Sequence, residues 1–115
     1  MTKAWFKNRL NDHYLQKSRA DDYRSRAAYK LEEIDQKYRL IKPGMKILDL
    51  GAAPGSWSQY ALRKVNGKAK IIAIDLLEIA PIDGVTIIKG DIRAPENQAK
   101  IIELAPNGLD VILSD

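Results

Sequence analysis

Four short apolar segments, separated by stretches rich in polar and turn residues, constrain the fold of this 115-residue chain most. Two of the intervening stretches have helical periodicity: one runs from Ser56 to about Val65, and the other opens at Pro95 and ends near Leu104. Parallel strands require such crossovers, because a tight turn joins only antiparallel neighbours. The pattern therefore predicts an α/β fold, with a mainly parallel sheet covered on both faces by helices. The expected strands are residues 45–50, 69–76, 85–90 and 109–114.

A helical lead-in is expected ahead of the first strand. Asp21 or Asp22 is a suitable N-cap for a helix that continues to about Tyr38. Lys30 would project about 60° from the middle of the apolar stripe of this helix, at the border between core and solvent. The turn residues at positions 42–44 end the lead-in. The apolar stripe recurs every three or four residues and consists of Tyr23, Ala27, Leu31, Ile34 and Tyr38.

The positive charge of the chain is concentrated in its first third. Residues 1–42 contain 11 basic and 6 acidic side chains, whereas residues 43–115 contain 8 basic and 9 acidic ones. The basic residues are interleaved with aromatic ones, a mixture that suits phosphate contacts and stacking on nucleic-acid bases. A solvated helical face whose aromatic rings dock into the core has the same composition, so charge alone leaves both interpretations open.

Several classes of protein and site are excluded by composition. The absence of cysteine excludes disulfides, thiolate metal sites and a cysteine nucleophile. His13 is the single histidine and has no companion at metal-ligand spacing, so no metal site is expected. The longest aliphatic run, residues 71–74, is far shorter than the roughly 20 residues of a membrane helix. The first ten residues also lack the apolar core of a signal peptide, so the expected location is cytoplasmic.

An aspartate stands at or just after the end of every expected strand. These residues are Asp49, Asp75, Asp91 and Asp115. The carboxyl ends of parallel strands share one edge of a sheet, and ligands of open α/β sheets bind in the crevice outside that edge. One acidic strand end is common as a helix cap or loop residue, but four are harder to explain in that way. We therefore expect the four carboxylates to form an acidic rim around a binding site.

The charge of this rim distinguishes between the ligands that glycine-rich loops commonly hold. The loop at residues 51–55 reads Gly-Ala-Ala-Pro-Gly. Asp49 and Asp115 would repel the pyrophosphate of a dinucleotide, whereas they would attract the sulfonium and ammonium groups of S-adenosylmethionine. Asp75 would then accept hydrogen bonds from the ribose hydroxyls and Asp91 from the adenine amino group, with the loop backbone facing the methionine part. An NAD-dependent dehydrogenase domain is the less favoured alternative.

Five stretches of the sequence together resemble the FtsJ/RrmJ family. They are RSRAAYKL (24–31), PGMKILDLGAAPGSWSQY (43–60), AIDLL (73–77), GDIR (90–93) and DVILSD (110–115). The first motif combined with LDLGAAPG and a following tryptophan is specific, whereas LDLG alone is shared by most methyltransferases. The resemblance covers residues 12–115 and implies a Rossmann-like class I methyltransferase fold. It implies S-adenosylmethionine-dependent methyl transfer to a ribose 2′-hydroxyl of RNA, most closely a uridine of 23S-type large-subunit ribosomal RNA.

The resemblance also implies a catalytic Lys-Asp-Lys-Glu tetrad. Lys30 matches its first lysine and Asp115 its aspartate, while the proton-accepting second lysine and the glutamate belong after residue 115. The charge pattern adds candidate RNA contacts at Lys3, Lys7, Arg9, Arg24 and Arg26. The candidate cofactor-binding residues are Asp49, Gly51, Ala52, Ala53, Pro54, Gly55, Trp57, Asp75, Leu76, Asp91, Ile92 and Asp115.

Several of these positions also have an ordinary structural interpretation. A tryptophan on a helix face, such as Trp57, is more often a core residue than a cofactor contact. Without the resemblance, Lys30 would be a lysine whose stem covers apolar surface. Asp49 either lines the methionine pocket or holds the glycine loop through backbone N–H groups. Arg26 either contacts RNA or pairs with an acidic neighbour.

The resemblance divides the chain into a basic helical lead-in, residues 1–42, and a cofactor-binding half-domain, residues 43–115. The family sheet has seven strands, so the strand at 109–114 is expected to leave an unpaired apolar edge through which the chain self-associates. We therefore expect this chain to be part of a longer protein, and by itself inactive or weakly active. The expected partner is ribosomal RNA or the large ribosomal subunit, with no membrane. A non-catalytic S-adenosylmethionine- or RNA-binding module remains the alternative.

Overall fold

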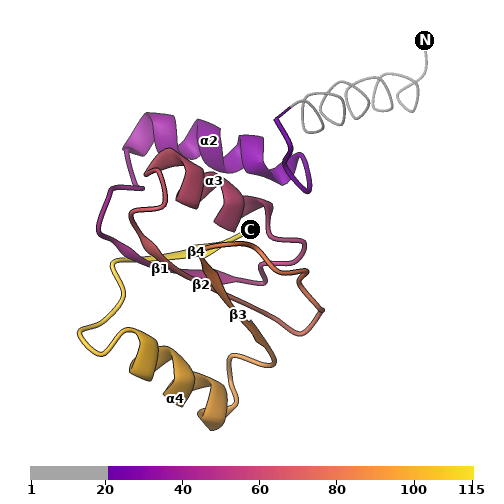
Figure 1. The fold of residues 1–115 in the computed structure, drawn as a ribbon, viewed down its shortest axis with the longest axis vertical. Helices are drawn as coiled ribbons and strands as arrows, with labels where there is room; N and C mark the ends of the chain where they lie inside the picture. The colour runs from indigo at the N-terminus through magenta and orange to yellow at the C-terminus, as the bar shows by residue number, and fades with distance from the viewer. Residues whose placement is uncertain (1–20) are drawn as a thin grey trace.

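The computed structural model describes residues 21–115 (Figure 1). Strands and helices follow one another as the sequence pattern predicts, so the α/β fold is confirmed, and each predicted strand lies within two residues of its expected bounds. The predictions for residues 1–20, among them the RNA contacts of Lys3, Lys7 and Arg9, lie outside the described residues. The elements are α2 (Ala27–Tyr38), β1 (Lys46–Leu50), α3 (Ser56–Lys64), β2 (Lys70–Asp75), β3 (Val85–Lys89), α4 (Pro95–Leu104) and β4 (Val111–Ser114).

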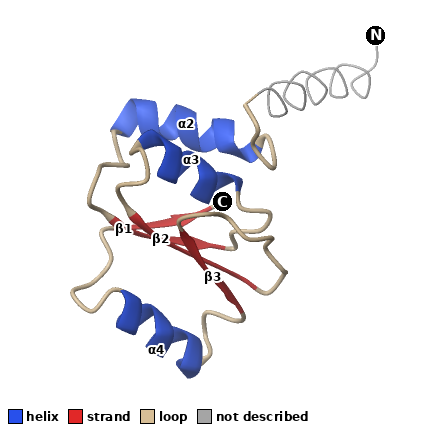
Figure 2. Ribbon diagram, in the orientation of Figure 1, coloured by secondary structure: helices blue, strands red, loops and turns tan. Residues whose placement is uncertain are grey.

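The four strands form one parallel sheet in the order β3-β2-β1-β4. Ile47 in β1 is paired with Ile71 of β2 on one side and with Val111 of β4 on the other. Figure 2 shows α2 and α3 on one face of the sheet and α4 on the opposite face. None of the helices within residues 21–115 is long and apolar enough to cross a membrane. Because all four strands run in the same direction, their carboxyl ends lie along one rim.

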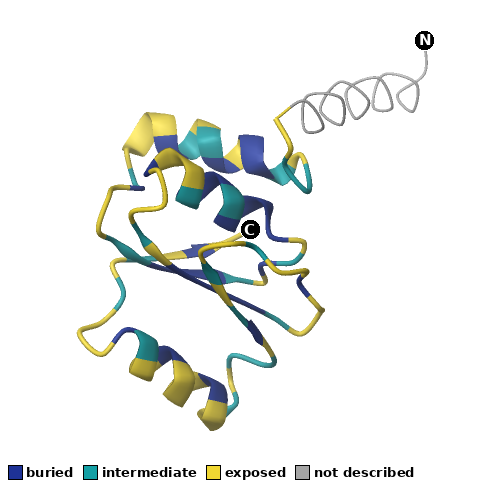
Figure 3. Ribbon diagram, viewed as in Figure 1, coloured by how far each residue is buried: buried dark blue, intermediate teal, exposed yellow. Residues whose placement is uncertain are grey.

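Side chains of the strands alternate between two cores, one on each face of the sheet. Ile47 packs with Leu31 of α2 in a cluster that also includes α3 residues. The next residue, Leu48, points to the other face and packs with Ile72 and with Ile101 of α4. In Figure 3 the buried positions run along the middle strands. Because β1 and β2 are buried on both faces, their carboxyl ends are held in place. The loops that follow these two strands start from those ends.

The start of α2 differs from the prediction. The helix begins at Ala27, and its N-cap position makes no side-chain capping hydrogen bond. Asp21 instead accepts a hydrogen bond from the Tyr29 hydroxyl at 2.5 Å. Asp22 lies in the left-handed region, with φ of 61°. The predicted cap at Asp21 or Asp22 is therefore wrong, because tertiary hydrogen bonds hold the segment before Ala27 in a turn, and no local pattern reveals such bonds.

The buried face of α2 is rotated relative to the predicted stripe. Leu31 is buried as predicted, whereas Tyr38 is 62% exposed. Asp35 is fully buried on this helix although it is charged. A buried carboxylate requires hydrogen-bond donors, and those of Asp35 come from α3 and the chain after α2. They are the Tyr60 hydroxyl (2.7 Å), the Ile41 backbone N–H (2.9 Å) and the Lys64 ammonium group.

β4 is an edge strand of the sheet formed by residues 21–115, as expected from the sequence. Leu113 is buried against α2 and α3, but Ile112, on the other face, is 58% exposed. The expected apolar edge is therefore present, while self-association through it stays a prediction.

Candidate functional site

The loop between β1 and α3, residues 51–55, turns at the carboxyl edge of the sheet. Gly51 and Gly55 have φ values of 65° and 114°, which residues with a side chain rarely adopt. Two N–H groups at the start of the loop donate to the Ile74 carbonyl, at 2.9 and 3.2 Å. The Ala53 N–H donates to Asp75 Oδ2 at 2.9 Å. The end of β2 therefore anchors the loop.

A small, open cleft lies between this loop, α2 and the end of β4. Seven of the twelve predicted cofactor-binding residues line it. None of its lining residues is basic, and two are aspartates. The lining residues are Ala27, Asp49, Gly51, Ala52, Ala53, Pro54, Ser56, Trp57 and Asp115.

Asp49 is the buried carboxylate of the cleft, with 2% of its surface exposed. Its Oδ2 accepts a hydrogen bond from the Ser58 hydroxyl at 2.8 Å, so it holds the first turn of α3 rather than the glycine loop. Burial is the main cause that raises the pKa of Asp49 to about 6. The negative charges of Asp115 and Asp75 also raise this pKa, whereas the hydrogen bonds from Ser58 lower it. A cation in the cleft would stabilise the ionised form of this carboxylate.

Lys30 and Asp115 form an ion pair at the edge of the cleft. Lys30 Nζ lies 2.8 Å from Asp115 Oδ1, which joins α2 to the residue that follows β4. The two side chains are 62% and 43% exposed, so Lys30 lies on the solvent side of the border predicted for it. An ion pair this exposed adds little to stability. Its structural effect is to hold a cationic nitrogen beside the carboxylates of the cleft.

Asp75 stands next to the cleft and not in its lining. Its Oδ2 accepts the Ala53 N–H, and its Oδ1 accepts the Leu77 N–H at 2.9 Å. Both oxygens are thus fixed in direction, and each keeps a lone pair for a further donor. The next residue, Leu76, is a predicted cofactor contact and has 67% of its surface exposed.

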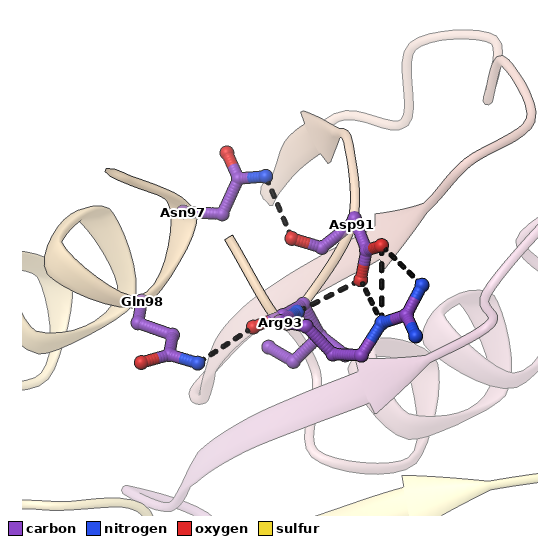
Figure 4. Close-up of polar contacts among 5 residues, drawn as sticks. Asp91, Arg93, Asn97 and Gln98 are labelled. Carbon is purple, nitrogen blue, oxygen red and sulfur yellow. Dashed lines mark hydrogen bonds and ion pairs between the residues drawn. The ribbon is translucent and has the colours of Figure 1, made fainter. Parts of the chain in front are cut away.

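Asp91 lies at the far end of the rim and does not line the cleft. Figure 4 shows the guanidinium and the backbone N–H of Arg93 directed at its carboxylate, at 2.8–3.1 Å. The hydrogen bonds from Arg93 lower the pKa of Asp91 to about 2. Side chains of α4 fix the neighbouring backbone: Asn97 donates to the Asp91 carbonyl and Gln98 to the Ile92 carbonyl. The adenine contacts predicted for Asp91 and Ile92 remain predictions.

The four aspartates share one rim but not one cleft. Along the rim they follow the strand order, as Asp91, Asp75, Asp49 and Asp115. The cleft contains the last two, and Asp75 is linked to it through Ala53. Within residues 21–115, no group of three or more histidines and acidic residues is placed to hold a metal ion.

Two other predicted residues have well-defined structural contacts. Arg24, a predicted RNA contact, donates hydrogen bonds to the backbone carbonyls of Pro54, Ala80 and Pro81. The RNA prediction did not anticipate this use of its guanidinium group. Trp57 is a core residue, 7% exposed, whose Nε1 donates to the Ala27 carbonyl at 2.6 Å. It also lines the cleft, and the predicted cofactor contact stays a prediction.

The sequence interpretation missed two lining residues, Ala27 and Ser56. Ser56 directly follows the glycine loop at the start of α3, so its position alone was a usable signal. Ala27 belongs to α2 and reaches the cleft only because α2 packs beside α3. Arg93 was also missed as the partner of Asp91, although a basic residue two positions after an aspartate at a strand end is a visible pattern.

Comparison with known proteins assigns this chain to a family. A family model described as FtsJ-like methyltransferase matches residues 23–115. A solved structure described as a ribosomal RNA methyltransferase of Plasmodium falciparum is 42% identical, with a TM-score of 0.75. That match covers 81% of this chain and 56% of the other one. The Rossmann-like methyltransferase fold expected from the sequence is therefore confirmed.

Curated relatives agree with the family match. A protein of Zymomonas mobilis named ribosomal RNA large subunit methyltransferase E is 53% identical over 111 residues, which is 96% of this chain and 50% of the relative. Proteins of the same name from Verminephrobacter eiseniae and Methylobacillus flagellatus are 47% and 48% identical, over 48% and 56% of their lengths. The chain thus spans about half the length of the curated relatives it matches.

Proposed function

Because this chain belongs to the FtsJ-like methyltransferase family, we propose that its protein transfers a methyl group from S-adenosylmethionine to a ribose 2′-hydroxyl of RNA. The names of the relatives make large-subunit ribosomal RNA the proposed substrate. The sequence adds a uridine as the proposed acceptor and the cytoplasm as the proposed location. In this proposal residues 1–42 are the lead-in that carries the catalytic Lys30. Residues 43–115 are the cofactor-binding half of the domain.

The donor set of the cleft fits this cofactor. Asp49 and Asp115 present negative charge to a sulfonium and an ammonium group, and no lining residue is basic. Asp75 keeps acceptor capacity for ribose hydroxyls on oxygens that two backbone N–H groups already orient. A pyrophosphate in the same place would meet the two carboxylates of the cleft, which supports the methyl donor over a dinucleotide.

The chain contributes positioning to the proposed reaction. When bound, S-adenosylmethionine supplies a methyl group activated by its positive sulfur. Asp115 holds the Lys30 ammonium 2.8 Å away, where it can donate to an oxygen of the RNA ribose or phosphate. Alignment of a reacting oxygen within about 3 Å of its target accounts for much of the rate in such transfers. The proton of the 2′-hydroxyl is assigned by the family resemblance to the lysine that follows Asp115 in the tetrad.

One observation carries this proposal: the Lys30–Asp115 ion pair lies beside a cleft that is also lined by the buried carboxylate of Asp49. The pair joins the first and the last of the five segments that carry the family resemblance, through two residues that are 85 positions apart in the chain.

Cofactor choice is tested by calorimetry on the 115-residue chain. We expect binding of S-adenosylmethionine and S-adenosylhomocysteine and none of NADH. Asp75→Ala should weaken binding of S-adenosylhomocysteine by a couple of kcal/mol, roughly thirtyfold, because hydrogen bonds to a charged group are lost. Preference for NADH, or a folded chain that binds neither S-adenosylmethionine nor S-adenosylhomocysteine, would refute the proposal.

Methyl transfer is tested on the longer natural protein with radiolabelled S-adenosylmethionine and large-subunit ribosomal RNA. Label should enter the RNA, and the modified linkage should resist alkaline cleavage, because a 2′-O-methyl group removes the internal nucleophile. Lys30→Ala should abolish transfer and leave the affinity for S-adenosylhomocysteine within about twofold. Label that leaves the alkaline pattern unchanged would mean methylation of a base, and the ribose assignment would then be wrong.

A further inference from the structure

Arg24 connects two loops that belong to different parts of the rim. Its Nη1 donates to the Pro54 carbonyl at 2.9 Å and to the Ala80 carbonyl at 2.6 Å. Its Nη2 donates to the Pro81 carbonyl at 2.7 Å. Pro54 belongs to the glycine loop after β1, and Ala80 and Pro81 belong to the loop after β2. One guanidinium group therefore bridges the two loops that flank the carboxyl ends of the central strands.

The backbone around Arg24 is also attached to the start of α3. The Arg24 N–H donates to Gln59 Oε1 at 2.9 Å. The next residue, Ser25, shares a hydrogen bond of 2.7 Å between its hydroxyl and that of Ser56. The Trp57 Nε1 donates to the Ala27 carbonyl. These bonds hold the backbone of Arg24 in a fixed position relative to α3, and from there its side chain reaches the two loops.

The two loops pack closely where Arg24 joins them. A Cβ atom at Gly55 would lie 2.6 Å from Ile82 Cδ1 and 3.4 Å from Arg24 Nη1. Ile79, from the same loop as Ile82, is 5% exposed and packs with Ala52 of the glycine loop. The contact between the loops thus has an apolar side, formed by isoleucines, and a polar side, formed by Arg24.

We propose that Arg24 is a positioning residue for the cofactor, which clamps the glycine loop to the loop after β2. The proposal rests on the proposed function, in which the first loop faces the methionine part and the second follows Asp75 at the ribose. An arginine suits this task because its planar fork has five donors in fixed directions, whereas a lysine ammonium has three donors around a single atom. The clamp acts through the two loops, without contact between Arg24 and the reacting atoms.

The clamp also gives a physical reason for two motifs to occur together. The RSRA segment at residues 24–27 and the GAAPGSW segment at residues 51–57 are separate in the chain, yet four hydrogen bonds join them directly or through Gln59. Loss of the hydrogen bonds from residues 24–27 would therefore make the loop at residues 51–57 more mobile. The competing role for Arg24, contact with an RNA phosphate, predicts no such effect on the loops.

The experiment compares Arg24→Ala with Arg63→Ala in the longer natural protein. Arg63 is the matched control, because its guanidinium also donates to backbone carbonyls, those of Asp21 and Asp22, but away from the two loops. Without ligand, amide hydrogen exchange of the non-proline residues in 51–56 and 79–82 should become at least about tenfold faster in Arg24→Ala than in Arg63→Ala. Unchanged exchange in both loops would overturn the clamp, whatever the protein binds.

Cofactor affinity is the second readout. S-adenosylhomocysteine should bind Arg24→Ala about tenfold or more weakly, while kcat at saturating S-adenosylmethionine stays within about threefold, since Lys30 and Asp115 are untouched. Added methylguanidine should restore part of the affinity in Arg24→Ala alone, and Arg24→Lys should fall between it and the native protein. Loosened loops with unchanged affinity would overturn the positioning role.

The remaining outcomes separate the two proposals. Weaker RNA binding with native loop exchange would assign Arg24 to RNA contact instead. If the native protein itself bound no S-adenosylhomocysteine, the proposed function would fail, and the exchange comparison would still decide whether the clamp exists. If Arg24→Ala failed to fold, the exchange of Arg24→Lys would decide in its place, with native values in both loops counting against the clamp.

Discussion

Asp49 is the residue on which the electrostatics of the site depend most. Its carboxyl is buried and lies near Asp115 and Asp75, and its pKa is raised to about 6. Keeping Asp49 ionised near pH 7 therefore costs the folded protein about 3 kcal/mol relative to an ordinary aspartate. The raised pKa means that this penalty grows as the pH rises from about 4 to about 6. A bound cation offsets it.

This raised pKa predicts that the affinity for S-adenosylmethionine depends on pH. Below about pH 6 Asp49 is protonated in the free protein and must lose its proton before it can attract the sulfonium. We expect the dissociation constant to rise up to about tenfold between pH 7 and pH 5. S-adenosylhomocysteine, whose sulfur is neutral, should show a smaller change, as measured by calorimetry at both pH values.

Asp49→Asn is the control for this pH dependence. The variant should bind S-adenosylmethionine more weakly at pH 7, and its affinity should change little between pH 5 and pH 7. Retention of the full pH dependence in the Asp49→Asn variant would assign the titrating group to another residue of the rim.

At the residue level, the site could be predicted where strand ends determine it. The positions of Asp49 and Asp115 follow from strand ends and one parallel sheet, and the structure places both in the cleft. The ion pair between Lys30 and Asp115 required the family resemblance, because no local pattern joins residues 85 positions apart. The contacts of Arg24 could not be predicted, because its acceptors are backbone carbonyls, which every sequence has.

The pair of helices α2 and α3 is joined by the buried carboxylate of Asp35. Burial tends to raise the pKa of Asp35, but hydrogen bonds from Lys64, the Ile41 N–H and Tyr60 outweigh it, so the pKa lies below its ordinary value of 3.8. Because the pKa of Asp35 is lowered, this network stabilises the fold at pH values above the ordinary pKa. The stabilisation is lost as the pH falls through the lowered pKa of the folded state. The helix pair is thus held by charge as well as by its apolar core.

Tyr60→Phe tests this network. It removes one donor from a carboxylate that stays buried, so the free energy of unfolding should fall by about 1–3 kcal/mol. Acid unfolding should begin at a higher pH than in the native chain, because Asp35 then ionises less readily. Tyr38→Phe is the matched control, since Tyr38 is 62% exposed, and should leave urea and acid unfolding almost unchanged. Equal behaviour of the two variants would contradict the role given to the network.

Elements could be predicted from the sequence wherever apolar periodicity and turn residues agree. The predicted helix from Pro95 to Leu104 matches α4 at both ends, because Pro95 fixes the first turn and a turn sequence follows Leu104. α2 was misplaced at its start because a good capping residue, Asp21, is used by Tyr29 instead. Its buried face was misjudged because Asp35 is polar, and apolar periodicity does not detect a buried carboxylate.

Across the whole molecule, charge is divided between the two ends of the sheet. Lys46 and Lys70 are paired in register at the amino ends of β1 and β2, and aspartates lie at or just after the carboxyl ends of all four strands. Because the strands are parallel, all acidic ends lie together, and the resulting field favours a cation at the carboxyl rim. The common direction of the strands thus turns a local sequence feature, an aspartate at or just after the end of each strand, into a property of one edge of the sheet.

The edge of the sheet at β4 leads to a prediction about association of the 115-residue chain. An edge strand presents unpaired backbone groups, and Ile112 adds an apolar side chain that is 58% exposed. We expect the sedimentation coefficient of this chain to rise with concentration, and Ile112→Lys to suppress that rise, because a charged edge side chain opposes strand pairing. Ile102→Lys is the control, since Ile102 is 65% exposed on α4, away from the edge. Suppression by Ile102→Lys alone would place the contact on the α4 face, and a native chain that sediments as a monomer at all concentrations would show that this edge does not pair.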